Sequence, residues 1–96
     1  EGRLALLRVL VDVTSAQLGI AQEDPIAAKA ALENTAAALV ELGEKLGPSE
    51  ASTVASLQDR LRLVQAELEA DIFAAQRDLE ILANSLLEIE RDHFGG

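Results

Sequence analysis

Several residue types are missing from the sequence, and each absence excludes a class of structure or site. There is no Cys, Met, Trp or Tyr, and there are only two Phe and one His. Without cysteine the chain cannot form a disulfide framework, a thiolate nucleophile, a zinc ribbon or an iron–sulfur cluster. Basic residues are also few, because 8 Lys and Arg stand against 17 Asp and Glu, for a net charge of −9 at pH 7. Such an acidic chain repels phosphate backbones and anionic headgroups, so we expect no nucleic-acid partner.

Long apolar runs are absent as well. No uninterrupted apolar run reaches the roughly 18 residues that a bilayer span needs, so we expect no membrane insertion within this segment. The wide apolar face of residues 4–21 is typical of helices that bind lipid surfaces, but the negative charge and the shortage of Trp and Phe oppose that role. The composition leaves the compartment open.

What the sequence does contain is typical of helices: 17 Ala and 17 Leu among 96 residues. Two clusters interrupt it. In the first, Asp24 can cap a helix and Pro25 stands at the first helical position, where a missing N–H costs nothing. In the second, Gly47-Pro48-Ser49 ends one helix and caps the next. The spacing predicts helices over about 3–22, 25–46 and 50–92, and no apolar alternation predicts a strand. We therefore expect a single all-α domain, a helical hairpin packed on a long third helix.

The third segment carries a 3-and-4 apolar spacing typical of a coiled coil. Two heptad runs join through steps of four from Val64 to Leu68 to Ile72, which is a stutter that a continuous helix tolerates. The first two helices would cover only half of such a rod, so the other half would pair with a second copy. This interpretation predicts a homodimer whose self-association residues are Leu68, Ile72, Ala75, Leu79, Leu82, Leu86 and Ile89.

An internal repeat supports an alternative. A shift of 47 residues aligns Asp24–Leu42 with Asp71–Ile89, with 8 identical pairs in 19 positions. If the repeat is structural, Asp71 caps a fourth helix as Asp24 caps the second, and a break near Ala70-Asp71 gives a compact four-helix unit. Such a unit would bind a peptide or small ligand in a groove. Because Asp inside a helix costs only a few tenths of a kcal/mol, we favour the continuous third helix.

The hairpin of residues 4–46 resembles known helical scaffolds. Its spacing is similar to the helix–turn–helix unit of tetratricopeptide-type repeats, and to the hairpin of membrane-anchored proteins labelled uroporphyrinogen-III methyltransferase homologues. The resemblance implies a scaffold that binds partner proteins, and it carries no functional residue across. The 47-residue period is longer than a tetratricopeptide repeat, and the Trp of that motif is absent. The residues that carry the resemblance are Ala16, Ile20, Asp24, Ala27, Ala28, Leu32, Ala36 and Leu39.

Chemistry-bearing residues are sparse. Glu90-x-x-His93 has the spacing of ligands in di-iron helical bundles, but a monomer would supply only half of the histidines, so a metal site would need a dimer interface. The simpler interpretation is an exposed cation near a helix C-terminus. His93 lies far along the chain from Ser49, Ser52 and Ser56, so a catalytic triad would need the chain to fold back. We therefore expect no enzyme, no cofactor and no metal.

A few apolar residues lie off the helical seams. Phe73 is the only aromatic residue inside a helix, and we interpret it as filling a gap at the edge of the core, with a partner anchor as the alternative. We expect the first two helices to cover most of Leu63, Ile81 and Leu87. The ends, Glu1-Gly2 and Phe94-Gly95-Gly96, indicate a piece of a longer protein. Together these observations favour a non-catalytic helical module for oligomerisation or protein interaction.

Overall fold

The computed structural model describes residues 2–94 and places them in a bundle of four α-helices. Glu1, Gly95 and Gly96, which belong to the ends interpreted above as cut, lie outside the described residues. No strand occurs between residues 2 and 94, so the all-α prediction is confirmed. The elements are α1 (Gly2–Ala21), α2 (Pro25–Leu46), a 3₁₀ turn (Pro48–Glu50), α3 (Ala51–Ala70), α4 (Ile72–Ile89) and a π-helical turn (Glu90–Phe94).

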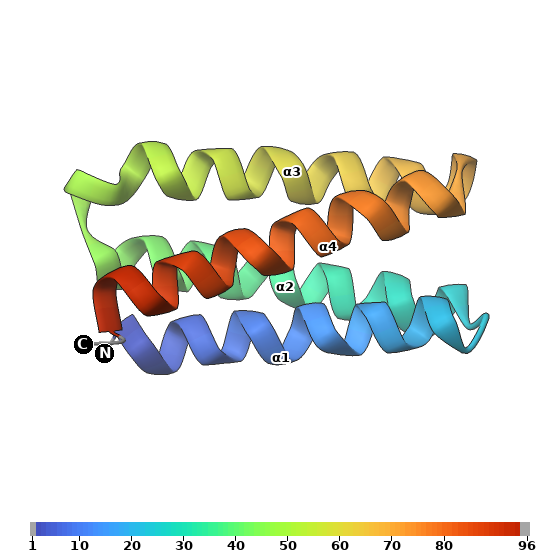
Figure 1. The fold of residues 1–96 in the computed structure, drawn as a ribbon, viewed down its shortest axis with the longest axis horizontal. Helices are drawn as coiled ribbons and strands as arrows, with labels where there is room; N and C mark the ends of the chain where they lie inside the picture. The colour runs from blue at the N-terminus through green and yellow to red at the C-terminus, as the bar shows by residue number, and fades with distance from the viewer. Residues whose placement is uncertain (1, 95–96) are drawn as a thin grey trace.

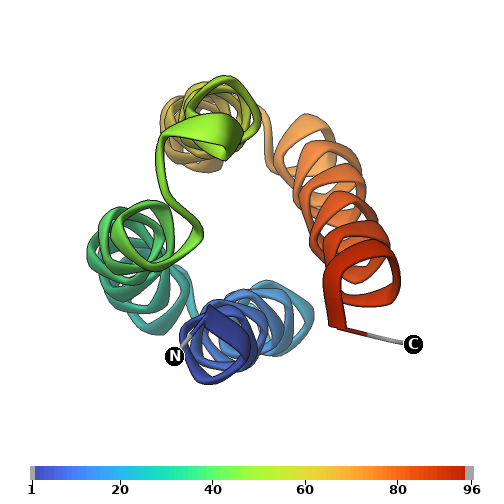
Figure 2. The same cartoon turned by 90° about the vertical axis from the view of Figure 1, so that its left-hand side faces the viewer.

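The four helices run alternately up and down and form a closed ring around one core (Figures 1 and 2). α1 packs on α2 and α4, and α3 packs on the same two helices, so each helix has two neighbours. The α1–α2 and α3–α4 connections lie at one end, and the α2–α3 connection lies at the other (Figure 1). The bundle measures 36 × 20 × 19 Å, so its length is about that of one helix.

The core is built from aliphatic side chains at helical spacing on all four inner faces. The helices have 20, 22, 20 and 18 residues, so each can cover its neighbours along the whole length. The largest fully buried side chains are Leu6, Val9, Val13, Leu32, Leu39, Leu42, Leu61, Val64, Leu79, Leu82 and Leu86.

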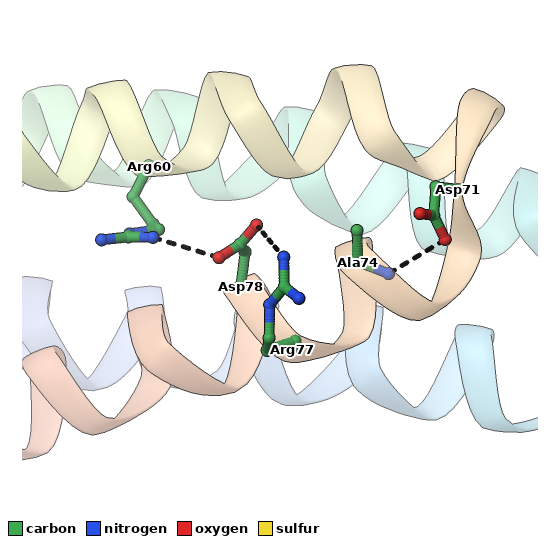
Figure 3. A network of polar contacts seen from close by, with 5 residues as sticks. All are labelled: Arg60, Asp71, Ala74, Arg77 and Asp78. Atoms are coloured by element: carbon green, nitrogen blue, oxygen red, sulfur yellow. Dashed lines mark hydrogen bonds and ion pairs between the residues drawn. The ribbon is translucent and has the colours of Figure 1, made fainter.

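The prediction of one continuous third helix over 50–92 is wrong. The chain reverses at Asp71, whose φ of −153° and ψ of 94° are extended, and the alternative of a break at 70–71 is confirmed. Asp71 caps α4 as the repeat predicts. Its carboxylate accepts a hydrogen bond from the Ala74 N–H at 3.2 Å (Figure 3). In the first hairpin, the Asp24 carboxylate accepts one from the Ala27 N–H at 3.1 Å.

The reversal costs little and gains much. The Asp71 N–H still donates to the Glu67 carbonyl at 2.7 Å, and the Ala75 N–H donates to the Asp71 carbonyl at 3.0 Å, so few backbone groups lose a partner. In return α4 buries its apolar face within its own chain. Burial of each large aliphatic side chain stabilises the folded state by about 1.5–3 kcal/mol. A continuous rod would need a second copy for the same burial and would bear the association entropy, about 4 kcal/mol or more.

The repeat describes two helical hairpins that differ by one residue. The buried face of α2 maps onto that of α4 with the predicted shift of 47 residues, whereas the buried face of α1 maps onto that of α3 with a shift of 48. The extra residue lies in the first connection, where Glu23 adopts a φ of 58° in the left-handed region. Under the shift of 48, the buried Leu6, Val9, Val13, Ala16 and Ile20 correspond to Val54, Leu57, Leu61, Val64 and Leu68.

Candidate functional site

The residues predicted to form a self-association seam lie in the core of the single chain. Leu79, Leu82 and Leu86 are fully buried, and only Ile72, at 37% exposure, reaches the surface. The seam therefore cannot meet a second copy while the bundle is closed. It was misassigned because 3-and-4 spacing describes the inner face of a helical hairpin as well as it describes a coiled coil. The other three residues of the seam, Leu68, Ala75 and Ile89, are buried too.

The outer face of α1 instead carries an exposed row of aliphatic side chains. Leu4, Leu7, Val11 and Leu18 are 66%, 41%, 63% and 55% exposed, and we call them the α1 strip. Their spacing of three, four and seven places them along one side of the helix. The sequence predicts a wide apolar face on this helix, and the structure turns only its inner row toward α2 and α4.

The corresponding positions of α3 show that the fold does not require an apolar outer row. Under the shift of 48 that superimposes the two buried faces, the α1 strip corresponds to exposed residues that are small or charged. Two helices with the same place in their hairpins therefore differ on the outside. The α3 residues at these positions are Ser52, Ala55, Asp59 and Ala66.

The polar side chains that border the α1 strip include few acidic residues, and two nearby glutamates are paired with arginines of α1. Asp12 is the only acidic residue of α1. Arg8 pairs with Glu41 of α2 at 2.9 Å, and Arg3 pairs with Glu90 at the end of α4 at 3.2 Å. The strip thus belongs to the least acidic helix of a chain whose net charge is −9.

The middle of the α1 strip is hollowed and apolar. Both hydroxyls there are hydrogen-bonded within the helix. Thr14 donates to the Leu10 carbonyl at 2.8 Å, and Ser15 donates to the Val11 carbonyl at 3.0 Å. By length and composition α1 could also cross a membrane, with a mean hydropathy of 1.6, yet core helices pass the same test. The shallow hollow is lined by Leu7, Leu10, Val11, Thr14 and Ser15.

The isolated apolar residues of the second hairpin are more exposed than the sequence predicted. Phe73 is 79% exposed, so it does not fill a gap at the core edge, and its possible role as a partner anchor stays a prediction. Leu63, Ile81 and Leu87 are exposed as well, so the expectation that α1 and α2 cover them is wrong. In a ring of four helices, α1 and α2 contact only the inner faces of α3 and α4.

The reversal at Asp71 brings His93 back to the start of α3. Its Nε2 lies 3.4 Å from a carboxylate oxygen of Glu50, beside a polar hollow. Such a meeting needs the chain to fold back, and the matching caps at Asp24 and Asp71 are the sequence signal for that reversal. The hollow is lined by Glu50, Ser52, Thr53, Ser56, Leu57, Ser85, Glu88, Ile89, Asp92 and His93.

Glu90 and His93, which have the spacing of metal ligands, contact different parts of the bundle. Glu90 contacts Arg3 of α1, whereas His93 contacts Glu50, because the π-helical turn changes the angular step between residues. Within residues 2–94 there is no group of three or more His, Asp and Glu placed to hold a metal ion.

One carboxylate is buried between α3 and α4. Asp78 is 4% exposed and accepts a hydrogen bond from Arg60 at 3.1 Å, and a nitrogen of Arg77 lies 3.9 Å away (Figure 3). The half-buried Glu67 lies close by, and its Oε1 has no hydrogen-bond partner within the described part of the chain. Burial raises the pKa of Glu67 above its ordinary value, and the neighbouring Asp78 carboxylate adds to the rise.

The sequence matches no protein-family model, and comparison with curated proteins and with solved structures finds no match either. The likeness to tetratricopeptide-type hairpins therefore stays a prediction.

Proposed function

We propose that this four-helix bundle is a non-catalytic protein-interaction module and that the α1 strip is its docking surface. The observation that carries the proposal is the row of exposed aliphatic side chains on α1, which the matching helix α3 replaces with small or charged residues. Apolar surface rimmed by polar residues marks interaction sites on folded proteins.

The magnitude of the apolar effect supports this use. Full burial of an exposed Leu or Val stabilises by about 1.5–3 kcal/mol, so the four side chains of the α1 strip can supply several kcal/mol to a complex. The strip presents them at the spacing by which helices dock on helices. A helix of another polypeptide is therefore the fitting partner. The non-catalytic part of the proposal draws support from His93, whose imidazole is paired with Glu50 rather than with a serine hydroxyl within residues 2–94.

Site-specific photo-crosslinking in the cells that produce the protein tests the proposal. A photoreactive amino acid replaces Val11 in the full chain, and the matched control replaces Val40, which is 54% exposed on α2. We expect crosslinks from position 11 to polypeptide and few from position 40. Equal crosslinking at both positions, or capture of lipid alone at position 11, would contradict the proposal.

A second candidate function uses the polar hollow beside His93. Glu50, Glu88 and Asp92 give it an acidic lining, and Ser52, Ser56 and Ser85 add hydroxyls, which suits a basic peptide or a small amine. Titration of the protein with an arginine-rich peptide, followed by amide chemical shifts, tests this function. Shifts confined to the start of α3 and the end of α4 and lost in Glu88→Gln would support it, and shifts spread over all acidic faces would refute it.

A further inference from the structure

We propose that the partner of the α1 strip is a second copy of this chain, docked with the two α1 helices antiparallel across a two-fold axis near the centre of the helix. This inference rests on the proposed function and names the partner. A homodimer was expected from the sequence through the seam of α4, and the structure moves the candidate interface to the opposite hairpin.

The spacing of the strip is self-complementary. In an antiparallel pair of helices, each core residue packs between residues of the facing helix, so positions on the two sides alternate. With the axis between Val11 and Thr14, Leu7 of each copy lies against Leu18 of the other, and Leu4 lies against Ala21. Val11 of each copy then lies beside Thr14 of the other, and all four strip residues are covered.

The centre of the strip is shaped to receive a side chain. The hollow lined by Leu7, Leu10, Val11, Thr14 and Ser15 surrounds the position of the axis. Because the Thr14 and Ser15 hydroxyls donate to carbonyls of their own helix, an apolar side chain can enter without leaving them unsatisfied. In the proposed arrangement, Val11 of the second copy lies over this apolar hollow, beside Thr14.

Charge favours a copy docked by α1 over any other face of the same chain. In this arrangement Arg8 of one copy lies near Ser15 of the other, and Leu10 lies near Gln17, so no like charges meet. Glu41 of α2 reaches the edge of this contact, where it is paired with Arg8 of its own copy. A chain of net charge −9 meets its copy with the least repulsion through α1.

The area required is within reach of one helix face. A standard interface buries about 800 Å² on each partner, which is about one-seventh of the 5609 Å² accessible surface of the described chain. A contact of that size would cover the exposed residues that flank the α1 strip as well as the strip itself.

Sedimentation equilibrium of matched variants tests the surface. We expect Val11→Glu to weaken dimerisation at least about tenfold, because two carboxylates would be buried in the contact. Val40→Glu, an equally large change on α2, is expected to leave the dimer unchanged. The quadruple variant Leu4→Ser, Leu7→Ala, Val11→Asp, Leu18→Ala copies the outer row of α3 and is expected to be helical by circular dichroism and monomeric.

Cysteine crosslinking tests the geometry, since the chain has no cysteine of its own. Val11→Cys is expected to form a covalent dimer with a short thiol crosslinker. Leu7→Cys alone and Leu18→Cys alone are not expected to form one, because each cysteine would lie about 16 Å along the helix axis from the same cysteine of the other copy. A mixture of these last two variants is expected to crosslink. The opposite pattern, with Leu7→Cys and Leu18→Cys each pairing with itself, would overturn the antiparallel arrangement.

The failure of this inference differs from the failure of the proposed function. A strictly monomeric wild-type chain at about 100 μM, well above the micromolar dissociation constants of specific complexes, would overturn the homodimer. Equal weakening by Val40→Glu would overturn it too, and so would vesicle binding that requires the α1 strip. In the first two cases, crosslinks from position 11 to a different polypeptide would leave the interaction module in place.

Discussion

At the scale of single residues, Asp78 is the position where α4 departs most from its counterpart. It stands where α2 has the buried Ala31, so one hairpin buries a methyl group and the other a carboxylate. Arg60 donates to that carboxylate from α3 with its own side chain 39% exposed. The ion pair therefore joins a buried carboxylate to a partly solvated guanidinium. Removal of one partner should change the free energy of unfolding by a different amount than removal of the other.

We expect Arg60→Ala to lower the free energy of unfolding by about 1 kcal/mol, because it leaves the Asp78 carboxylate buried with a weaker cation partner. Asp78→Ala is expected to cost less, since Arg60 can turn into water and α2 shows that alanine fits the equivalent position. Urea denaturation of both variants measures the difference. A larger loss for Asp78→Ala than for Arg60→Ala would contradict this asymmetry.

Glu67 gives the same region a dependence on pH. Its pKa is raised above the ordinary 4.5 by burial, by Asp78 and by Asp71, with Arg77 acting in the opposite direction. Because the folded state holds this proton more tightly than the unfolded state, the contribution to stability is present below pH 4.5 and is lost as pH rises through the raised pKa.

Glu67→Gln is therefore expected to raise the thermal midpoint at neutral pH, where wild type has a charged and poorly solvated carboxylate. The gain should shrink as pH falls below 4.5, because wild-type Glu67 is then protonated in both states. Melting curves across this range test it, with Glu69→Gln as the exposed control on the same helix. A constant difference at every pH would refute the assignment to Glu67.

At the scale of elements, the sequence predicted helices and their outer ends well. The ranges 3–22 and 25–46 agree with α1 and α2 to within a residue, because Asp24-Pro25 and Gly47-Pro48 are strong local signals. The α3–α4 break was weighed and not favoured, because Asp71 alone is a weak local signal. Whether the helix breaks depends on where its apolar face is buried. Periodicity cannot distinguish burial within one chain from burial in a coiled coil of two chains, since both require 3-and-4 spacing. The feature of the sequence that indicated the break is the repeated N-cap, Asp24 before α2 and Asp71 before α4.

The two caps predict that the second connection tolerates a proline. Ile72 occupies the first helical position of α4, as Pro25 does in α2, and the extended backbone of Asp71 is the conformation that a following proline favours. We expect Ile72→Pro to change the free energy of unfolding by less than about 1 kcal/mol. Gln65→Pro, inside α3, is expected to cost about 3 kcal/mol or more. Thermal unfolding compares them, and equal losses would mean that the backbone at Asp71 is helical in solution.

At the scale of the whole molecule, the sequence predicts self-association through the seam of residues 68–89, whereas the exposed apolar row of the bundle lies on α1. The sequence shows a wide apolar face over residues 4–21, and the α1 strip is the part of that face that stays exposed in the bundle. Periodicity predicts how wide the apolar face of a helix is. Which part of that face stays exposed to solvent depends on how the four helices pack in the ring. The comparison of α1 with α3 needs the structure, because the shift that aligns their inner faces is 48 and the shift seen in the sequence is 47.

The global charge gives the proposed dimer a salt dependence with a definite sign. The Debye length is about 30 Å at 0.01 M salt, close to the 36 Å length of the bundle, so most of the charge on each copy repels the other. At 0.15 M it falls to about 8 Å, and only groups near the α1 contact still interact. Because that contact is apolar and its flanking pairs bring no like charges together, we expect the dissociation constant to fall severalfold between these two conditions. Analytical ultracentrifugation at both salt concentrations measures it, with the quadruple strip variant monomeric throughout. A dimer that weakens as salt is added would instead be held by opposite charges and would not be the one proposed.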